Sequence, residues 1–330
     1  MAALSFLHSQ LFVTPALPNH DFSGQTVLVT GGNRGLGFEA ARHLLRLNAS
    51  RVLLAVRSLP SGDAAKELLE ASTNRPDAVR VYEVDMASHV SVQAFAEQMR
   101  SLDRLDAVLL NAGIFADEFV LQDGYESTLT VNVINTFLLA LLLLPVLRAS
   151  ASASQRELPR LSIVASDRHV MTNLPEWKEP NTFEALNDPK RAKMRLRYSA
   201  SKLLQILLAR ELARRLLDST GKPTIIVNSF TPGFTTSGLI ANARGLTAST
   251  FRLLGKAIAR ETEVGARTLV TAIAMGPESH GKYLNDGKIE EAALSPFVRG
   301  KDGARAQEKV WKELMEILEQ RVPSISRNIA

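Results

Sequence analysis

Short apolar runs alternate with longer helical patterns along this chain of 330 residues. The runs are rich in β-branched residues and show no polar alternation, which is typical of strands buried on both faces of a parallel sheet. Such strands are expected at 26–30, 51–56, 79–84, 106–110, 160–166 and 224–230. Helices are expected near 35–47, 62–72, 90–100, 124–148 and 198–218. The alternation predicts an α/β fold with one doubly wound parallel sheet flanked by helices.

Residues 1–20 precede the first strand and form an N-terminal extension, and 21–330 reads as one domain because no Pro/Gly-rich linker divides it. Two irregular segments, 167–197 and 234–261, follow the fifth and sixth strands. Open α/β sheets bind ligands at the carboxyl ends of their strands, so both segments are expected to be substrate loops. The second is rich in apolar residues and is expected to close over a bulky substrate. The alternative is a pair of tolerated surface insertions.

Composition excludes several classes of protein. Hydrophobic residues make up 45% and charged residues 22% of the chain, which is ordinary for a globular protein and excludes disorder. The absence of cysteine excludes a disulfide framework and fits an intracellular, cytoplasmic protein. The net charge is +5 and the isoelectric point about 9.5, but the basic residues are spread along the chain, so no nucleic-acid partner is expected.

Membrane insertion and secretion are not expected either. The N-terminal stretch MAALSFLHSQLF has neither a basic region nor a small-residue cleavage site, so it does not read as a secretory signal. The most apolar run, TFLLALLLLPVL at 136–147, is shorter than the roughly 20 residues of a membrane span. It therefore predicts a buried helix.

The first expected strand leads into a helix through the glycine-rich loop TGGNRGLG, residues 30–37. Gly31, Gly35 and Gly37 allow a tight turn and let a pyrophosphate approach the helix N-terminus, where free N–H groups favour an anion. The spacing is GxxxGxG instead of GxGxxG, so the loop alone is weak evidence. Its place between a first strand and a first helix of a Rossmann-type fold favours dinucleotide binding.

The residue after the second strand points to the choice of cofactor. NAD-binding domains usually carry Asp or Glu there, whereas this chain has Arg57. A guanidinium suits a 2′-phosphate, and Arg34 in the glycine-rich loop would add a second cation. This pattern favours NADP(H). The alternative is that Arg57 is an ordinary solvated arginine.

Polar residues stand at three further strand ends: Asp85, the LNAG stretch at 110–113, and Ser166. Tyr198 and Lys202 are four residues apart, which places them on one face of the expected helix 198–218. An ammonium near a phenol would lower the tyrosine pKa toward neutral pH and make the hydroxyl a proton donor and acceptor. We expect these groups to converge at one edge of the sheet.

Taken together, these residues resemble a classical short-chain dehydrogenase/reductase over roughly 21–285. The matching motifs are TGGNRGLG, Asp85, LNAG, Asn132 in a helix, Ser166, YSASK at 198–202 and TPGF at 231–234. SIVASDRH and YSASKLL are most similar to the retinol-dehydrogenase-like branch, and the chain also resembles fungal reductases of secondary metabolism. Asn135, Leu110 and Ala165 depart from common family residues, and none of them removes a catalytic group.

The resemblance implies hydride transfer between NADP(H) and a hydrophobic polyketide-, terpenoid- or retinoid-like substrate, with reduction of a ketone or aldehyde. Tyr198 would be the proton donor, Ser166 would orient the substrate oxygen, Lys202 would hold the nicotinamide ribose, and Asn132 would anchor a water chain. No metal is required. The expected cofactor contacts are Gly31, Asn33, Arg34, Gly35, Leu36, Gly37, Arg57, Asp85, Met86, Asn111, Ala112, Gly113, Tyr198, Lys202, Pro232, Gly233 and Thr235.

Alternatives stay open at this point. One is an NADP+-dependent alcohol dehydrogenase working in the oxidative direction, and another is a catalytically silent cofactor-sensing protein on the same fold. Helices 124–148 and 198–218 either pair into a homodimer or cover the sheet with the same leucines. His169 either lines the substrate cleft or is a solvated loop residue. Trp177 and Phe183 are expected to pack in the core or to contact substrate, with core packing favoured.

Overall fold

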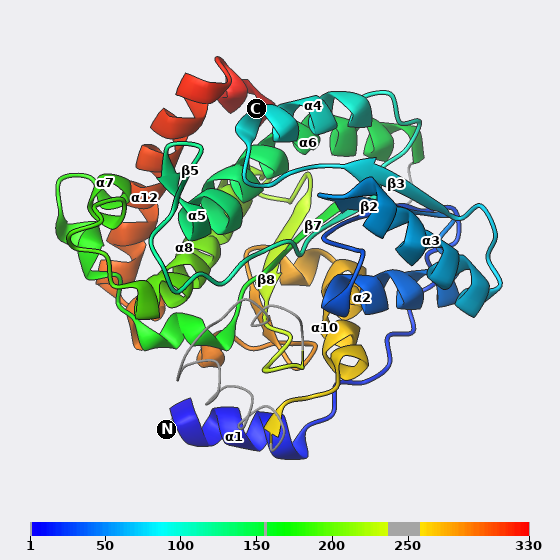
Figure 1. The fold of residues 1–330 in the computed structure, drawn as a ribbon, viewed down its shortest axis with the longest axis horizontal. Helices are drawn as coiled ribbons and strands as arrows, with labels where there is room; N and C mark the ends of the chain where they lie inside the picture. Colours follow the sequence, from blue (N-terminus) through cyan, green and yellow to red (C-terminus); the bar gives the residue numbers. More distant parts are fainter. Residues whose placement is uncertain (1, 155–156, 237–257, 330) are drawn as a thin grey trace.

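The computed structural model describes residues 2–154, 157–236 and 258–329. Its centre is an eight-stranded sheet in the order β10-β9-β8-β7-β4-β1-β2-β3 (Figure 1). The strands are β1 Thr26–Thr30, β2 Arg51–Val56, β3 Val79–Glu83, β4 Ala107–Leu110, β7 Arg160–Val164, β8 Ile226–Phe230, β9 Tyr283–Asn285 and β10 Lys288–Ile289. Neighbours pair in parallel, except β9 with β10. The predicted doubly wound α/β fold is confirmed.

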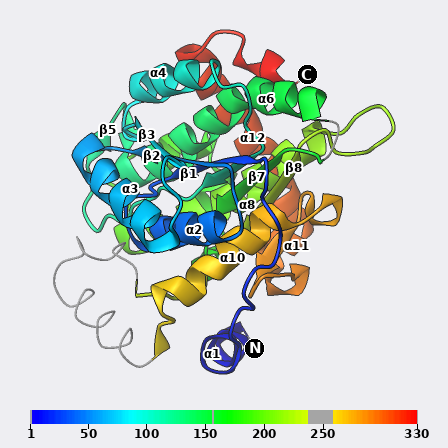
Figure 2. The ribbon, with the colours of Figure 1, turned by 90° about the vertical axis from the view of Figure 1, so that its right-hand side faces the viewer.

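Helices cover both faces of the sheet (Figure 2). One face packs against α2 Gly35–Arg46, α3 Leu59–Thr73 and α10 Thr262–Ala274. The other packs against α4 His89–Met99, α6 Asn135–Ser154 and α8 Met194–Arg215. Strand β1 shows why the apolar run at 26–30 has no alternation of polar and apolar residues. Leu28 faces one layer of helices while Val27 and Val29 face the other, so both faces of the strand are buried.

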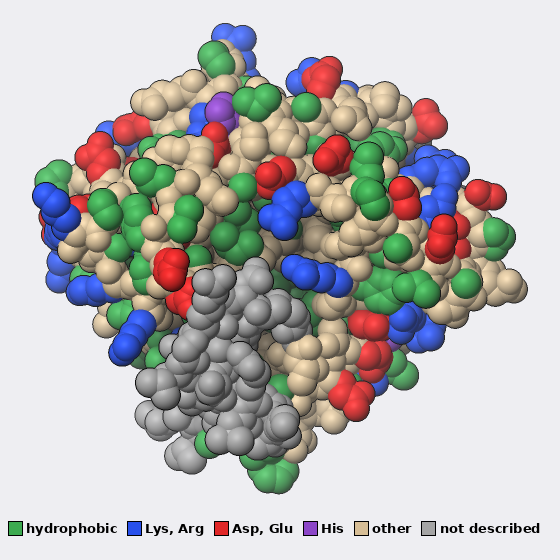
Figure 3. Space-filling model, viewed as in Figure 1, with side chains coloured by type: hydrophobic (Ala, Val, Ile, Leu, Met, Phe, Trp, Pro, Cys, Tyr) green, Lys and Arg blue, Asp and Glu red, His purple; other side chains and the backbone are tan. Residues whose placement is uncertain are grey.

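Charged side chains are mixed on the face shown in Figure 3, where Lys and Arg alternate with Asp and Glu and form no single basic patch. The helical stretch Ser127–Ser150 is long and apolar enough to cross a membrane, but 94% of its apolar window is buried in the protein. It is a core helix, as the short apolar run at 136–147 predicts. The compartment stays a prediction.

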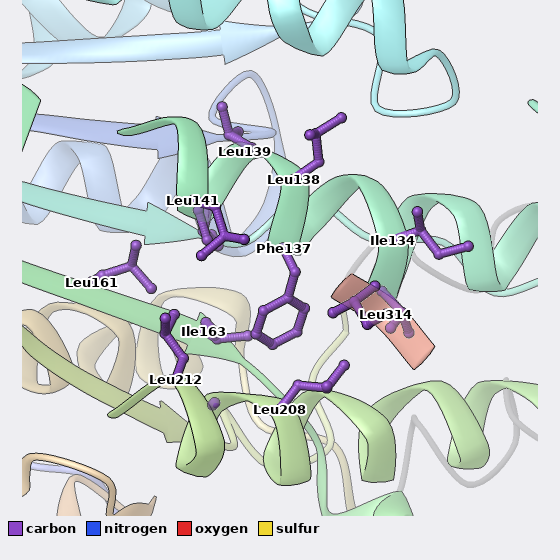
Figure 4. Packing of buried hydrophobic residues seen from close by; sticks show 14 of the residues in the cluster. Ile134, Phe137, Leu138, Leu139, Leu141, Leu161, Ile163, Leu208, Leu212 and Leu314 are labelled. Carbon is purple, nitrogen blue, oxygen red and sulfur yellow. The ribbon is translucent and has the colours of Figure 1, made fainter. Parts of the chain in front are cut away.

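The C-terminal part covers the helices that the homodimer prediction involves. Helix α12, Lys301–Arg321, packs along α8, and the short helix η7, Ile325–Ile329, packs on α6. Leu314 of α12 is fully buried in the same cluster as Phe137 and Leu208 (Figure 4). The leucines of α6 and α8 therefore have partners within the chain. The homodimer stays a prediction.

Two expected helix boundaries differ from the structure. The expected helix 124–148 begins with α5 Ser127–Leu129 and a π-helical turn, η1 Thr130–Ile134, before α6. Its first residues instead belong to a hairpin formed by β5 Leu121–Gln122 and β6 Tyr125–Glu126, with Gly124 at φ 86° in the turn. Helix α8 begins at Met194, so Tyr198 lies in its second turn, not at its first residue.

The segment 167–197 contains η2 Asp167–Met171, η3 Pro175–Lys178 and α7 Thr182–Leu186. Phe183 is fully buried and Trp177 packs against the same core, which confirms the favoured core packing. In the second predicted substrate loop, residues 237–257 lie outside the described residues, so closure over a substrate stays a prediction. Elements missed by the sequence patterns are α1 Ala2–Phe12, α10, η5 Pro277–Ser279, β9, β10, η6 Glu291–Ala293, α11 Pro296–Arg299, α12 and η7.

Candidate active site

The glycine-rich loop joins β1 to α2 in a conformation that its glycines require. Gly31 and Gly35 have φ values of 66° and 59°, a region that side chains with a Cβ rarely adopt. A Cβ atom on Gly37 would lie 2.5 Å from the Gly31 carbonyl oxygen. The start of α2 can therefore approach the loop closely. This cradle, with the free N–H groups of a helix N-terminus beside it, fits a dinucleotide pyrophosphate.

Asn111 and Ala112 connect the end of β4 to this loop. The Oγ1 atom of Thr30 accepts hydrogen bonds from the backbone N–H groups of Asn111 and Ala112, each at 2.9 Å. The Asn111 side chain donates to the Thr30 carbonyl, also at 2.9 Å. These bonds fix the shape of the loop. The Asn111 amide consequently has a structural task beside its expected place at the cofactor.

The adenine side of the predicted cofactor site lies at the ends of β2 and β3. Arg34 and Arg57 are exposed there, on the loop and directly after β2. The Asp85 carboxylate accepts from the Ala87 N–H at 3.0 Å, and the Asn33 side chain donates to Ser61 at 2.7 Å. In Figure 3 the face is hollowed near its centre, where Lys and Arg side chains border hydrophobic ones.

Asn135, which stands where many family members carry glycine, also supports this side. Its Nδ2 donates to the Met86 carbonyl at 2.9 Å, and its Oδ1 accepts from Arg321 at 2.7 Å. The amide thus links the segment after β3 to the end of α12. Asparagine in place of glycine therefore provides the hydrogen bond between this position and Arg321 of the C-terminal helix α12.

Tyr198 lies at the opposite end of the site with only 7% of its surface exposed. The side chain of Ser166 neighbours its hydroxyl, and its ring lies 5.6 Å from that of Phe115. Burial raises the Tyr198 pKa to about 12, more than the Ser166 hydrogen bond lowers it. The expectation of a lowered tyrosine pKa is therefore wrong for this structure, because burial outweighs the neighbouring groups.

The position of Lys202 also explains why the Tyr198 pKa is not lowered. Its Nζ lies 5.5 Å from the centre of the Tyr198 ring and donates to the Val164 carbonyl at 2.7 Å and to Gln205 Oε1 at 2.8 Å. Burial lowers the Lys202 pKa to about 7. The ammonium is therefore bonded away from the phenol hydroxyl, and it loses its charge near neutral pH.

Asn132 sits in the π-helical turn η1 and is fully buried. Its side chain accepts from the Ile114 N–H at 2.8 Å and donates to Ser201 Oγ at 3.1 Å. Its backbone carbonyl accepts from Gln205 Nε2 at 2.7 Å. The wider turn frees this carbonyl from the regular helical pattern, which is a common use of π-turns at functional sites.

Of two titratable residues that follow Ser166, His169 differs from both expectations. His169 is fully buried, so it is neither a solvated residue nor a lining of the cleft. Its Nδ1 lies 2.9 Å from the Ser166 carbonyl and its Nε2 accepts from the Ser295 N–H at 3.1 Å, so Nδ1 carries the proton. Asp167 hydrogen bonds Tyr283 and Thr231, and burial raises its pKa to about 6.

The segment after β8 forms the remaining wall. Gly233 has a φ of 75° and donates its N–H to Thr231 Oγ1 at 3.1 Å. Thr235 follows with 7% of its surface exposed and forms an isolated parallel bridge with Arg260. Because β8 is the neighbour of β7, Pro232, Gly233 and Thr235 lie on the Ser166 side of the site.

The parallel sheet thus brings the expected residues to one edge, with Arg34, Arg57 and Asp85 at one end and Ser166, Tyr198 and Lys202 at the other. Sequence patterns missed Gln205, although positions 198, 202 and 205 share one helical face and a glutamine is unusual within LLQILL. They also missed Thr30, whose contacts with Asn111 and Ala112 follow no local spacing. Within the described ranges, no group of three or more His, Asp or Glu residues is placed to hold a metal.

Comparisons with known proteins agree with this geometry. A family model described as short chain dehydrogenase matches residues 25–154. The short-chain dehydrogenase anuD of Penicillium roqueforti is 62% identical over 328 residues, covering 98% of this chain and 85% of the relative. The short chain dehydrogenase/reductase dmxR8 of a Cryptosporiopsis species is 39% identical, covering 98% of this chain and 100% of the relative.

Among solved structures, the RhlG/NADP active-site complex of Pseudomonas aeruginosa matches with a TM-score of 0.58 and 24% identity, covering 82% of this chain and 97% of that one. This match concerns the fold. The chain belongs to the short-chain dehydrogenase/reductase family and is an oxidoreductase by that membership. The expected resemblance to fungal members is confirmed.

Proposed function

We propose that the protein is an NADP(H)-dependent reductase that converts a ketone or aldehyde of a hydrophobic substrate into an alcohol. The observation that carries the proposal is the pairing of the buried Tyr198 with the half-buried Ser166 at the carboxyl edge of the sheet, where the Ser166 side chain acts on the phenol hydroxyl, on the same side of the sheet as Pro232–Thr235. The bulky polyketide-, terpenoid- or retinoid-like substrate class rests on the family resemblance.

The chemistry requires a hydride, which the nicotinamide ring supplies when NADPH is bound. The chain must supply a proton to the substrate oxygen. A pKa of about 12 keeps the Tyr198 hydroxyl protonated at neutral pH, so a proton is available there for the substrate oxygen. Ser166, beside the phenol, would donate a second hydrogen bond to the same oxygen. Phe115 beside the phenol ring offers an apolar contact for the substrate.

The preference for NADP(H) is supported by charge at the adenine end. Arg34 and Arg57 are both exposed there, and no carboxylate follows β2 within VRS, residues 56–58. A guanidinium can bind a 2′-phosphate with two parallel hydrogen bonds, whereas a ribose hydroxyl gains little from it. The NADP named for the Pseudomonas aeruginosa structure supports the same choice.

The experiment follows oxidation of NADPH and NADH by the purified protein against apolar aldehydes, cyclic ketones and β-ketones. We expect turnover with NADPH and a hydrophobic carbonyl, and a lower kcat/KM with NADH. A preference for NADH would contradict the assignment of Arg57. Binding of NADPH without turnover of any carbonyl or alcohol in the panel would favour a cofactor-sensing protein.

A further inference from the structure

The N-terminal helix α1 lies outside the layers of the sheet, beside the segment that follows β8 (Figures 1 and 2). Gln10 in its last turn is 8% exposed and pairs with the backbone of Phe234. The Phe234 N–H donates to Gln10 Oε1 at 3.0 Å, and Gln10 Nε2 donates to the Phe234 carbonyl at 2.9 Å. Gln10 Nε2 also donates to the Ile258 carbonyl at 3.0 Å. One side chain therefore satisfies three backbone groups of two separate chain segments.

Arg260 provides a second link between α1 and the same segment. Its backbone N–H donates to the Phe234 carbonyl at 2.9 Å. Its Nη2 donates to the Ser9 carbonyl at 2.7 Å, to the Val13 carbonyl at 3.1 Å and to Asp286 at 2.6 Å. The cation thus stabilises the carbonyl end of α1, where the helix dipole is negative. Its charge is compensated by the Asp286 carboxylate.

Gly233 shows how closely these two side chains hold the segment. A Cβ atom at this position would lie 2.5 Å from Gln10 Oε1 and 2.7 Å from Arg260 Nη1. The backbone of Gly233, at φ 75°, is therefore packed directly against both. Gly233 and Thr235 belong to the expected cofactor contacts, and they lie on the Ser166 side of the sheet, far along the strand order from β2 and β3.

Along residues 7–12 of α1, the large hydrophobic side chains are exposed, with values of 40% for Leu7, 51% for Leu11 and 76% for Phe12. The polar residues Ser9 and Gln10 are the buried ones, at 8% each. The specific contacts of α1 are thus hydrogen bonds to the wall of the active site. This is the pattern of a positioning element and differs from that of an ordinary core helix.

We propose that Gln10 is a positioning residue for the cofactor: the N-terminal helix holds 233–235 in the conformation that receives the nicotinamide half of NADP(H). The inference rests on the proposed function. When 233–235 already have the bound conformation in the free protein, cofactor binding does not pay the free-energy cost of ordering them. The affinity for NADP(H) therefore rises without a direct contact between Gln10 and the cofactor. The adenine half, at Arg34 and Arg57, is independent of this device.

The test compares Gln10→Met with Leu11→Met, a matched change at an exposed neighbour in α1. Dissociation constants are measured by calorimetry for NADPH and for adenosine 2′,5′-bisphosphate, which carries only the adenine half. Gln10→Met removes all three hydrogen bonds, and it is expected to weaken NADPH binding about tenfold and to leave binding of the bisphosphate within about twofold. Leu11→Met is expected to change neither constant.

An unchanged NADPH constant in Gln10→Met would overturn the inference. An equal loss for both ligands, with a lower Tm, would also overturn it, because it would show a general structural role. A wild-type protein that binds neither ligand would refute the proposed function itself. Because that outcome is seen with the wild-type protein, it is distinguished from the other two before any variant is measured.

Discussion

Lys202 Nζ lies 2.8 Å from Gln205 Oε1, so the buried lysine is bonded to an amide three residues further along α8. The same amide donates to the Asn132 carbonyl at 2.7 Å. Gln205 therefore directly joins Lys202, which is expected to hold the nicotinamide ribose, to Asn132, which is expected to anchor a water chain. An amide holds a geometry but does not readily give up a proton, so its role is to position Lys202.

The first prediction concerns this link. In Gln205→Glu a carboxylate replaces the amide beside Lys202, and its charge is expected to raise the lysine pKa above its present value of about 7. The corresponding limb of the pH profile of kcat/KM should move upward by about one unit or more. The profile is measured from pH 5 to 10 with NADPH and a carbonyl substrate found in the panel.

Gln205→Leu is the matched variant, because it removes the acceptor without adding a charge. It is expected to lower kcat and to move the limb in the opposite direction, since the ammonium loses a bond that favours the charged form. Profiles that coincide for all three proteins would show that Gln205 does not influence Lys202.

The second prediction concerns acid stability. Burial lowers the His169 pKa to about 4 from an ordinary value of 6.5. Between pH 6.5 and 4 the unfolded chain binds more protons at this residue than the folded chain, so this contribution to the free energy of unfolding falls as the pH falls, by about 3 kcal/mol at most. His169→Gln is expected to flatten this part of the stability profile, measured by urea unfolding.

Asp167→Asn is the control with the opposite sign. The Asp167 pKa is raised to about 6, so the folded chain binds more protons between pH 3.8 and 6, and this group loses stability as the pH rises. Removing the carboxyl should therefore stabilise the protein at neutral pH relative to pH 4. A stability profile that is identical in both variants and the wild type would contradict the burial of these two groups.

The third prediction concerns cofactor choice. Arg57→Asp places a carboxylate where the 2′-phosphate is expected, so the NADPH dissociation constant should rise at least about tenfold while NADH binding is retained or improved. Arg51→Asp is the control, because Arg51 is an exposed arginine at the other end of β2. Titrations of both cofactors check this, and equal effects of the two substitutions would indicate only a change in net charge.

The fourth prediction concerns packing by the C-terminal helix. Leu314 is fully buried between α12 and the leucine-rich layer of α6 and α8. Leu314→Ala is expected to lower the free energy of unfolding by about 2–5 kcal/mol, because it removes buried contacts and leaves a cavity. Leu68→Ala, at a leucine that is 63% exposed, should change it by less than about 0.5 kcal/mol. If Leu314→Ala lowered the free energy of unfolding as little as Leu68→Ala is expected to, α12 would contribute little to the core.

Sequence patterns predicted the inner strands because short apolar runs rich in β-branched residues, such as TVLVT, are typical of buried strands. This preference is local and does not depend on the rest of the fold. They did not yield α12, although Val310, Leu314, Ile317 and Leu318 recur at helical spacing. The Gln10–Phe234 pair was beyond their reach, because it joins residues that are 224 positions apart and depends on the final packing.

For the site, sequence patterns predicted where residues lie but not the pKa of Tyr198. Family motifs placed Ser166, Tyr198 and Lys202 correctly at one edge of the sheet, since motif spacing reflects helix and strand geometry. The Tyr198 pKa was predicted in the wrong direction, because its value depends on burial by Phe115 and other neighbours that spacing does not reveal. The corrected direction means that the phenol keeps its proton at neutral pH.

The most direct measurement of the central claim is deuteride transfer from NADPH that carries deuterium at both positions of nicotinamide C4, followed by mass spectrometry of the product. Wild-type protein is expected to form an alcohol that carries one deuterium on the carbinol carbon. Tyr198→Phe should bind NADPH with an unchanged dissociation constant but form that product at least about 100-fold more slowly. Deuterated alcohol formed at the same rate by both proteins would contradict Tyr198 as the proton donor, and the absence of deuterated alcohol with the wild type for every carbonyl in the panel would contradict the proposed reduction.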